Sequence, residues 1–142
     1  GVSQQIGDPA ERNRLQQLLA QLVADENLED GHGFILRTAA EGAGAQEIAA
    51  DCAYLRRVWS AVSQHAKSAS APALLYEDLP LQLRTVRDLA RPAVQSILVD
   101  SAECFATLHA FCASYVPEIA AKLELYRGGR ALFELYGVEG DI

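Results

Sequence analysis

An arginine and a threonine stand side by side where an apolar run ends in a loop of very small residues. Phe34, Ile35 and Leu36 precede Arg37 and Thr38, and the sequence then reads Ala-Ala-Glu-Gly-Ala-Gly-Ala. A guanidinium binds a phosphate through two parallel hydrogen bonds, and a threonine hydroxyl can donate to a third oxygen. The small residues leave backbone N–H groups accessible, which also suits an anion. The pattern predicts an anion pocket at Arg37 and Thr38.

Arg37 also has an ordinary interpretation. Residues 25–51 contain seven acidic side chains and one Lys or Arg, which is Arg37. An ion pair with Glu47 or Asp51, or a solvated position at a strand end, would explain the residue without any ligand. The region would then be a structural or protein-interaction module. The loop lacks the Gly-Lys-Ser/Thr of a P-loop and is not a dinucleotide fingerprint, so no standard motif decides between the two interpretations.

Three further arginines, Arg84, Arg87 and Arg91, repeat at i, i+3 and i+7. This spacing places them on one face of a helix predicted over residues 81–90. Such a stripe could follow an RNA backbone, because each guanidinium can pair with a phosphate. The competing interpretation is a solvated face whose arginines pair with nearby acids, among them Glu77, Asp78 and Asp88.

No catalytic constellation is evident. Asp100 follows an apolar run, where α/β folds often place catalytic carboxylates. A metal-dependent nuclease needs a second carboxylate close by, and neither Asp88 nor Glu103 is spaced to pair with Asp100. Asp100 with Ser101 instead makes a good N-cap for the next helix. The histidines have no Ser or Cys partner in a recognisable arrangement; they are His32, His65 and His109.

The cysteine pattern predicts reduced thiols in a protein core. Cys52, Cys104 and Cys112 each lie within an apolar helical repeat. Cys104, His109 and Cys112 could suggest a metal site. Cys104 and His109 are five residues apart, however, which is not a helical pairing, and no fourth ligand is near. We therefore expect no metal at these residues.

The composition is that of one substantial folded domain or two small ones. The chain has 142 residues, 50% of them hydrophobic and 22% charged. It has no apolar run of roughly 20 residues and no signal peptide, so a cytoplasmic protein is expected. A net charge of −7 argues against broad non-specific binding to nucleic acid, but not against a local site for one phosphate. Since it lacks Met and stops where an amphipathic run begins, the chain is interpreted as a piece of a longer protein.

Helices of about ten or more residues alternate with short apolar strands. The first helix starts with Asp8 as N-cap, Pro9 at the first position and Glu11 at the third, and an acidic segment over 25–30 follows it. The second helix carries an apolar stripe expected to face a core, made of Ile48, Cys52, Leu55, Trp59 and Val62. Helices are predicted over 9–23, 46–67, 81–90 (ended by Pro92), 102–115 and 131–136, and strands over 33–37, 73–76, 94–99 and 122–126. The alternation predicts an α/β fold of the mixed α+β kind, with a subdomain boundary at 68–72 or 79–80.

Four segments together resemble the ribonuclease E/G family, and its ribonuclease G branch more than its ribonuclease E branch. They are GFILRTAAEGAGAQEIAADCAYLRRVW, APALLYEDLPLQLRTVRDL, SILVDS and PEIAAKLELYRGGRALFELYGVE. The likeness runs over nearly the whole chain. Its RTAAEG block and its Leu-Arg-x-x-Arg-Asp block are specific to that family.

The resemblance implies a parent that is an Mg²⁺-dependent endoribonuclease (a hydrolase), which cleaves single-stranded RNA in ribosomal RNA maturation and messenger RNA decay and prefers a 5′-monophosphate. It implies a 5′-sensor domain over residues 1–82 and an incomplete, non-catalytic RNase H-like subdomain over residues 83–142. Arg37 and Thr38 match the family's phosphate-sensing pair. The catalytic aspartates and the cysteines of a zinc link, which joins subunits into a homo-oligomer, are expected downstream. This chain is therefore expected to bind neither metal and to be inactive alone.

The chain departs from the family at Gln4 and Gln5. The family commonly carries basic residues there, which help to hold the RNA end. A glutamine can form a hydrogen bond with a phosphate but brings no charge. The candidate secondary RNA contacts implied by the resemblance and by the arginine stripe are Gln4, Gln5, Arg84, Arg87 and Arg91.

Overall fold

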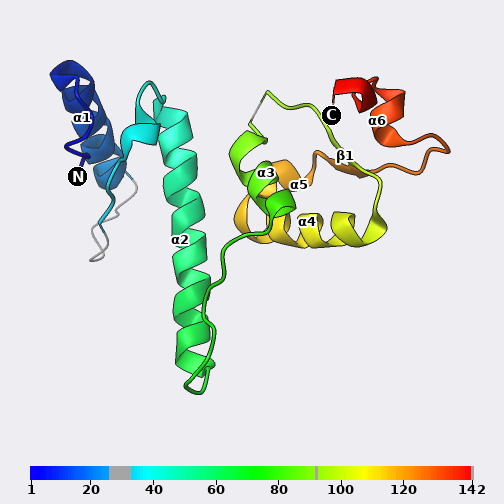
Figure 1. Ribbon diagram of the computed structural model, residues 1–142. Helices are drawn as coiled ribbons and strands as arrows, with labels where there is room; N and C mark the ends of the chain where they lie inside the picture. Colours follow the sequence, from blue (N-terminus) through cyan, green and yellow to red (C-terminus); the bar gives the residue numbers. More distant parts are fainter. Residues whose placement is uncertain (26–32, 92, 142) are drawn as a thin grey trace. The chain divides into compact units, whose positions relative to one another are not determined.

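The computed structural model describes residues 1–25, 33–91 and 93–141 (Figure 1). The chain forms two compact units, residues 1–59 and residues 60–142. The helices are α1 (Pro9–Asp25), α2 (Ala45–Ser68), α3 (Leu81–Leu89), α4 (Ala102–Tyr115), α5 (Pro117–Ala120) and α6 (Leu132–Leu135). The strands are β1 (Ile97–Val99) and β2 (Leu123–Leu125), and two 3-10 turns are η1 (Thr38–Ala40) and η2 (Glu139–Asp141). Helices combined with a small parallel sheet confirm the predicted α/β class; the assignment of residues 1–82 and 83–142 to named domains stays a prediction.

The start of α1 follows the predicted capping pattern. The Asp8 carboxylate accepts a hydrogen bond from the backbone N–H of Ala10 at 2.9 Å. The Asp8 carbonyl accepts the first helical bond, from the N–H of Arg12 at 3.0 Å. Because the first N–H groups of a helix have no partner within it, these bonds fix where α1 begins.

The first unit is built around a small apolar core that joins α1 to the start of α2. Ile6, Leu15, Ile48 and Cys52 are buried, the first two completely. Partly buried residues complete the cluster; they are Val2, Leu18, Leu22, Phe34, Leu36, Ala40 and Ala43. The described part of the segment before α2 is therefore anchored to this core, by Phe34 and Leu36 near its start and by Ala40 and Ala43 near its end.

Only the first part of the predicted α2 stripe is buried. Ile48 and Cys52 are 3% exposed, whereas Leu55 and Trp59 are 51% and 56% exposed. The prediction of a core-facing stripe is therefore wrong for Leu55 and Trp59. Helical spacing shows which residues share a face, but burial also needs a layer that covers this face.

In the second unit, β1 and β2 form a two-stranded parallel sheet. Ile97 pairs with Leu123 and Val99 with Leu125. The ladder is extended at its two ends by hydrogen bonds from the N–H of Ile97 to the carbonyl of Lys122 and from the N–H of Tyr126 to the carbonyl of Val99, both 2.8 Å long. Parallel strands need a crossover connection, and α4 and α5 supply it (Figure 1).

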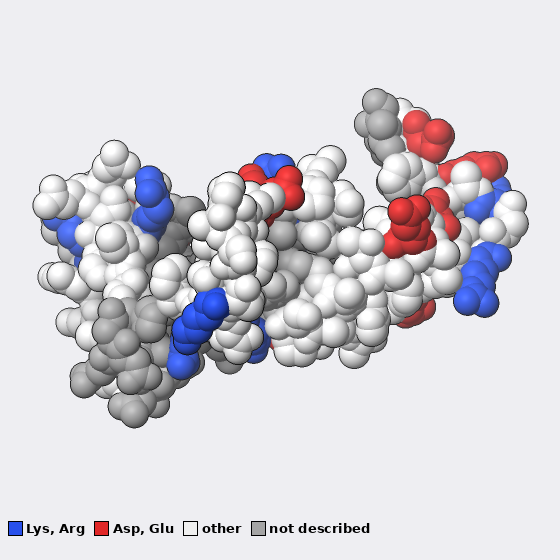
Figure 2. Space-filling model, turned by 90° about the horizontal axis from the view of Figure 1, so that it is seen from below, with Lys and Arg blue, Asp and Glu red and all other residues white. Residues whose placement is uncertain are grey.

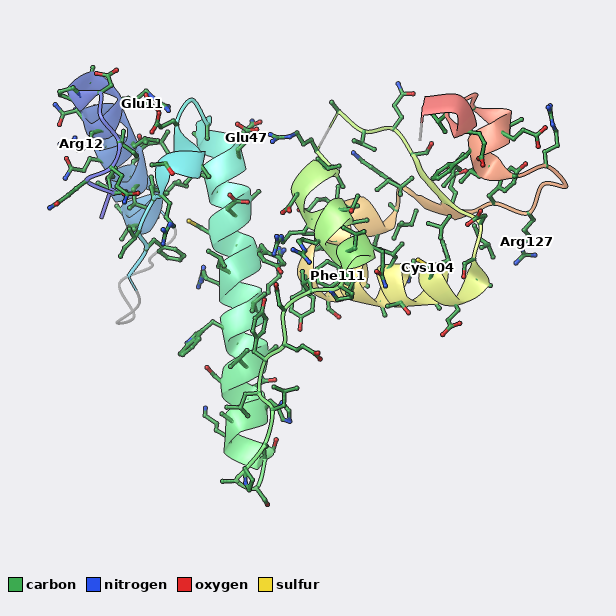
Figure 3. The ribbon with its side chains drawn as sticks, in the orientation of Figure 1. Glu11, Arg12, Glu47, Cys104, Phe111 and Arg127 are labelled. Atoms are coloured by element: carbon green, nitrogen blue, oxygen red, sulfur yellow. The ribbon has the colours of Figure 1, made fainter. Side chains whose placement is uncertain are left out.

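Helix α4 is the centre of the second unit. It contacts α3, α5 and both strands. Its buried side chains are Leu108, Phe111 and Cys112; Phe111 is labelled in Figure 3, and its ring centroid lies 5.2 Å from that of Tyr115. The Ser101 hydroxyl accepts a hydrogen bond from the N–H of Cys104 at 3.2 Å, so the predicted N-cap at Asp100-Ser101 is supplied by Ser101.

Two strand predictions differ from the structure. Residues 73–76 form no strand, and Leu74 and Tyr76 are 69% and 51% exposed. Residues 33–37 form only one isolated bridge, at Leu36. An apolar run becomes a strand only where a neighbouring backbone satisfies its N–H and C=O groups. The acidic residues 26–30, His32 and Pro92 lie outside the described residues.

Candidate functional site

A short parallel pairing positions the backbone just before Arg37. Val2 and Leu36 form a parallel bridge, in which Ser3 donates its N–H to the carbonyl of Leu36 at 2.8 Å. Leu36 donates its own N–H to the carbonyl of Gly1 at 3.0 Å, and the Gly1 amine donates to the carbonyl of Phe34 at 2.6 Å. The first three residues therefore hold the segment that leads into Arg37.

The residues after Leu36 form a tight loop, which we call the 37–44 loop. Arg37 is extended, and its carbonyl accepts from the N–H of Ala40 at 2.9 Å. Thr38 starts the 3-10 turn η1, and its carbonyl accepts from the N–H of Glu41 at 3.0 Å. Gly42 then adopts a positive φ of 76°, a conformation that costs a residue with a Cβ roughly 1–2 kcal/mol. The glycine is what allows the chain to turn here towards α2.

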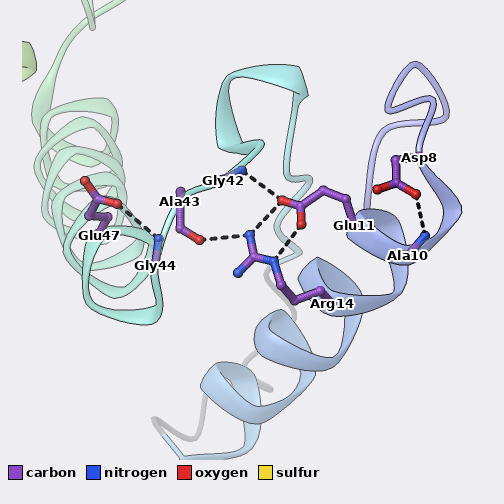
Figure 4. Close-up of polar contacts among 8 residues, drawn as sticks. All are labelled: Asp8, Ala10, Glu11, Arg14, Gly42, Ala43, Gly44 and Glu47. Carbon is purple, nitrogen blue, oxygen red and sulfur yellow. Dashed lines mark hydrogen bonds and ion pairs between the residues drawn. The ribbon is translucent and has the colours of Figure 1, made fainter.

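Two side chains of α1 hold the far end of this loop (Figure 4). The Glu11 carboxylate accepts a hydrogen bond from the N–H of Gly42 at 2.8 Å. The same carboxylate accepts from Nε and Nη2 of Arg14, both at 2.7 Å. Arg14 Nη2 also donates to the carbonyl of Ala43 at 3.0 Å. The four groups close a ring that ties two successive loop residues to α1.

The charge state of Glu11 follows from these contacts. The hydrogen bond from Arg14, followed by the hydrogen bond from the backbone of Gly42, lowers the pKa of Glu11 from 4.5 to about 2. The side chain is 18% exposed. Glu11 is therefore a fixed carboxylate at every physiological pH, and its charge is balanced by Arg14.

The loop ends in the capped N-terminus of α2. Gly44 donates its N–H to the Glu47 carboxylate at 3.0 Å, and the Gly44 carbonyl accepts from the N–H of Ile48 at 3.2 Å. Glu47 is labelled in Figure 3. Its carboxylate binds the backbone of the loop, and within the described residues Arg37 forms no ion pair with Glu47 or Asp51.

The predicted site residues are exposed at the start of this fixed loop. Both Arg37 and Thr38 are exposed, and the structure gives neither side chain a hydrogen-bond or ion-pair partner among the described residues. In the same part of the chain, the backbone N–H groups of Arg37, Thr38 and Ala39 have no acceptor. Residues 37–39 therefore carry five donor groups without an acceptor in this part of the chain: one guanidinium, one hydroxyl and three backbone N–H groups.

Gln4 and Gln5 leave the parallel pair at the same end as Arg37. They follow Ser3 in a turn, just as Arg37 and Thr38 follow Leu36, and both glutamines are exposed. The carboxyl ends of parallel strands lie side by side. The structure thus brings these two predicted residues to the neighbourhood of Arg37.

The arginines of α3 are arranged differently from the prediction. Arg87 forms an ion pair with Asp88, with 2.7 Å between Arg87 Nε and Asp88 Oδ1. The hydrogen bond from Arg87 and the charges of Arg87 and Arg84 lower the pKa of Asp88. Arg91 lies beyond the last residue of α3, so the three arginines do not share one helical face as predicted. On the face drawn in Figure 2, the described Lys and Arg side chains form small separate patches rather than a continuous basic surface.

The histidines and cysteines form no second site in the described part of the chain. The ring of His109 lies 5.7 Å from that of Phe105. Cys112 is fully buried, and this burial, together with the charge of Glu118, raises the pKa of its thiol. No group of three or more His, Cys, Asp or Glu residues within the described ranges could hold a metal ion, and none of the helices described there is long and apolar enough to cross a membrane.

Comparison with known proteins decides the family. The sequence profile described as the Ribonuclease E/G family matches residues 1–142. The chain belongs to the ribonuclease E/G family. It is 42% identical to Ribonuclease G of Escherichia coli (strain K12) and 34% identical to Ribonuclease G of Haemophilus influenzae, each over 142 residues. It is also 31% identical to Ribonuclease E of Escherichia coli (strain K12) over 144 residues.

All of this ribonuclease E/G chain is matched, but only part of each relative. The chain covers 28% of the length of these Ribonuclease G relatives and 13% of the Escherichia coli Ribonuclease E. The higher identity to Ribonuclease G agrees with the resemblance drawn from the sequence.

Sequence reasoning on this ribonuclease E/G region missed Glu11 and Arg14. Their i, i+3 spacing is that of a helical ion pair, which the sequence could have indicated. Glu11 was expected only as part of the helix start. Its bond to Gly42, 31 positions later, has no local signal, because glycine and alanine offer no side chain with which to pair.

Proposed function

We propose that this region enables an endoribonuclease of the ribonuclease E/G family to recognise the 5′-monophosphate of single-stranded RNA. Arg37 binds two phosphate oxygens and Thr38 a third. The observation that supports this most is that both side chains are exposed and have no partner among the described residues, at the start of a loop that is held on both sides. Loop backbone N–H donors strengthen the attraction for an anion.

The chemistry of the donors favours a terminal phosphate over an internal one. A 5′-monophosphate has three non-bridging oxygens and a charge of about −1.5 to −2 at neutral pH. An internal phosphodiester has two such oxygens and one charge. Arg37 and Thr38 together offer at least three donors, so the terminal group, with its third oxygen and its larger charge, should bind them more strongly.

The expected affinity is low. A bidentate arginine and one hydroxyl supply roughly 3–5 kcal/mol, from charge-assisted bonds of about 1.5–3 kcal/mol each. This corresponds to a dissociation constant of about 1 mM. The pocket therefore discriminates between RNA ends, and the rest of the enzyme, together with the candidate secondary contacts, supplies affinity.

Cleavage belongs to the whole enzyme in this proposal, in ribosomal RNA maturation and messenger RNA decay. Mg²⁺ and Zn²⁺ were expected for the parent, but the described residues of this chain do not fit a metal site, and we derive no metal-dependent step from them. We expect the chain alone, with added Mg²⁺ and 5′-monophosphorylated RNA, to give no cleavage above a buffer control. Turnover that copurifies with the folded chain would contradict this.

An NMR titration at low salt tests the recognition step. A short 5′-monophosphorylated RNA and its 5′-hydroxyl twin are added separately to the chain and to Arg37→Ala. We expect shifts at residues 37–46 with the phosphorylated RNA only, and their loss in Arg37→Ala. Arg127→Ala is the matched control, because Arg127 is also exposed and lies in the other unit (Figure 3). Equal shifts with both RNAs would contradict the proposal and favour the structural or protein-interaction module.

A further inference from the structure

We infer that Glu11 and Arg14 are positioning residues for phosphate recognition: through Gly42 and Ala43 they set the shape of the loop that presents Arg37 and Thr38. The inference rests on the proposed function, since the phosphate is the ligand whose binding it explains. Neither side chain belongs to the pair that would touch the phosphate. Both act on the backbone of the loop.

The 37–44 loop has few side chains that could fix its conformation. Five of its eight residues, Ala39, Ala40, Gly42, Ala43 and Gly44, are Ala or Gly. Alanine offers little side chain to pack, and glycine loses more backbone freedom on folding than any other residue. Besides its own backbone hydrogen bonds and the packing of Ala40 and Ala43 on the core, the loop therefore needs restraints from groups outside it.

Among the described residues, the groups that impose it are few and can be named. Gly1 and Ser3 hold Leu36 at the loop entrance, and Glu47 holds Gly44 at its exit. Between these points, Glu11 binds the N–H of Gly42 and Arg14 the carbonyl of Ala43 (Figure 4). Glu11 and Arg14 thus hold the loop at its positive-φ turn.

Glu11 and Arg14 position each other: the Glu11 carboxylate accepts hydrogen bonds from Arg14, and these bonds in turn orient the carboxylate. Arg14 Nη2 lies 2.7 Å from Glu11 Oε1 and 3.0 Å from the Ala43 carbonyl, and Glu11 Oε1 also accepts the Gly42 N–H. Removing Glu11 would free Arg14 as well, so the loop would lose both of its bonds to α1. Removing Arg14 would leave the Glu11–Gly42 bond in place.

Whether removal of Glu11 weakens or strengthens phosphate binding distinguishes a positioning role from a purely electrostatic one. Taking a negative charge away from an anion site should strengthen anion binding if only charge matters. Taking away a positioning group should weaken it. We expect Glu11→Ala to raise the dissociation constant for 5′-monophosphorylated RNA about tenfold, the loss typical when a supporting contact to a binding group is removed. Binding of the 5′-hydroxyl RNA should not change.

Glu41→Gln is the matched control. Glu41 is in the same loop and exposed, and its carboxylate has no partner among the described residues. The substitution therefore removes the same charge without removing the bonds to α1. We expect phosphate binding that is equal to or tighter than that of the wild type. Glu11→Gln, which keeps one oxygen for Gly42, should lie between the wild type and Glu11→Ala.

The experiment combines the RNA titration with amide hydrogen exchange on the full chain. The exchange of the Gly42 amide should accelerate at least tenfold in Glu11→Ala and remain slow in Glu41→Gln, while the core amide of Leu15 stays protected in both. Loss of Leu15 protection would mean that Glu11→Ala unfolds the first unit. The positioning role would then be judged from the phosphate binding and the Gly42 exchange of Glu11→Gln.

The possible outcomes are distinct. Tighter phosphate binding by Glu11→Ala, or unchanged binding with an exposed Gly42 amide, would overturn the positioning role while leaving the proposed function intact. If the wild-type chain does not distinguish the two RNAs, the proposed function fails and the positioning role fails with it. The Gly42 amide then still reports whether Glu11 orders the loop.

Discussion

The carboxylate of Glu11 lies 2.8 Å from the backbone nitrogen of Gly42, 31 residues further along the chain. This contact joins a helix that carries no predicted ligand-binding residue to the loop that carries Arg37 and Thr38. The charge of Glu11 is balanced by Arg14, one turn along the same helix.

The Glu11 contact should make stability depend on acid pH. The folded pKa of Glu11 is lowered to about 2 from an ordinary value of 4.5, so its contribution is complete above pH 4.5 and is lost as the pH falls towards 2. Urea unfolding of the wild type and Glu11→Gln between pH 2 and 7 measures this. The difference between the two should be constant above about pH 5 and should shrink as the pH falls. A difference that grows on acidification would contradict the contact.

Arg37→Ala should leave stability nearly unchanged. Arg37 is exposed and has no partner among the described residues, and such surface substitutions usually change the free energy of unfolding by less than about 0.5 kcal/mol. Arg12→Ala is the informative comparison, because Arg12 is half-buried and donates to the carbonyl of Ile6 at 2.5 Å. Arg12→Ala should lower the free energy of unfolding clearly more than Arg37→Ala does in the same urea titration. A loss of several kcal/mol in Arg37→Ala would instead assign Arg37 a structural role.

Gly42→Ala should destabilise the first unit by about 1–2 kcal/mol, because a Cβ is unfavourable at a φ of 76° even where the surrounding space is open. Gly42→Asn should cost less, since asparagine tolerates this region better. Gly129→Ala is the control: its added Cβ also meets open space, and its φ is not positive. Thermal unfolding of the three variants checks the order, and equal effects at positions 42 and 129 would contradict it.

The cysteines should differ in reactivity towards a thiol reagent. Cys112 is fully buried, and its thiol pKa is raised, so little thiolate forms at pH 8. Cys52 is also buried, whereas Cys104 is partly exposed. In the folded protein we expect Cys104 to react first and Cys112 only after unfolding. Mass spectrometry of the labelled peptides reads out the order, and fast labelling of Cys112 would mean that the second core opens readily.

The parts of the fold that sequence predicted well are those fixed by local chemistry. The predicted bounds of α4 match the structure, because a polar N-cap at Ser101 and an apolar repeat both lie within the helix itself. The start of α1 at Asp8-Pro9 was predictable for the same reason. The strands were harder. Their length depends on a partner that sequence does not identify, so 94–99 was reduced to Ile97–Val99 and 73–76 formed no strand.

The candidate site shows the same division. Arg37 and Thr38 could be selected from their types and their place before a loop of small residues. The structure adds that neither has a partner within the described part of the chain, so the alternative of an ion pair from Arg37 to Glu47 or Asp51 is not observed there. The hydrogen bonds from Glu11 and Arg14 to the loop could not be predicted from the sequence. They are made to backbone atoms of Gly42 and Ala43, and the spacing of side chains gives no information about such contacts.

The hydrogen bonds that join Gly1 and Ser3 to Leu36, just before Arg37, have a consequence for protein engineering. Residues 37–44 copied alone into another scaffold would bring the arginine and the threonine but not the loop geometry, because its restraints come from the first three residues, from α1 and from the start of α2. A transfer of the loop therefore has to include residues 1–3, α1 and the first turns of α2 as well.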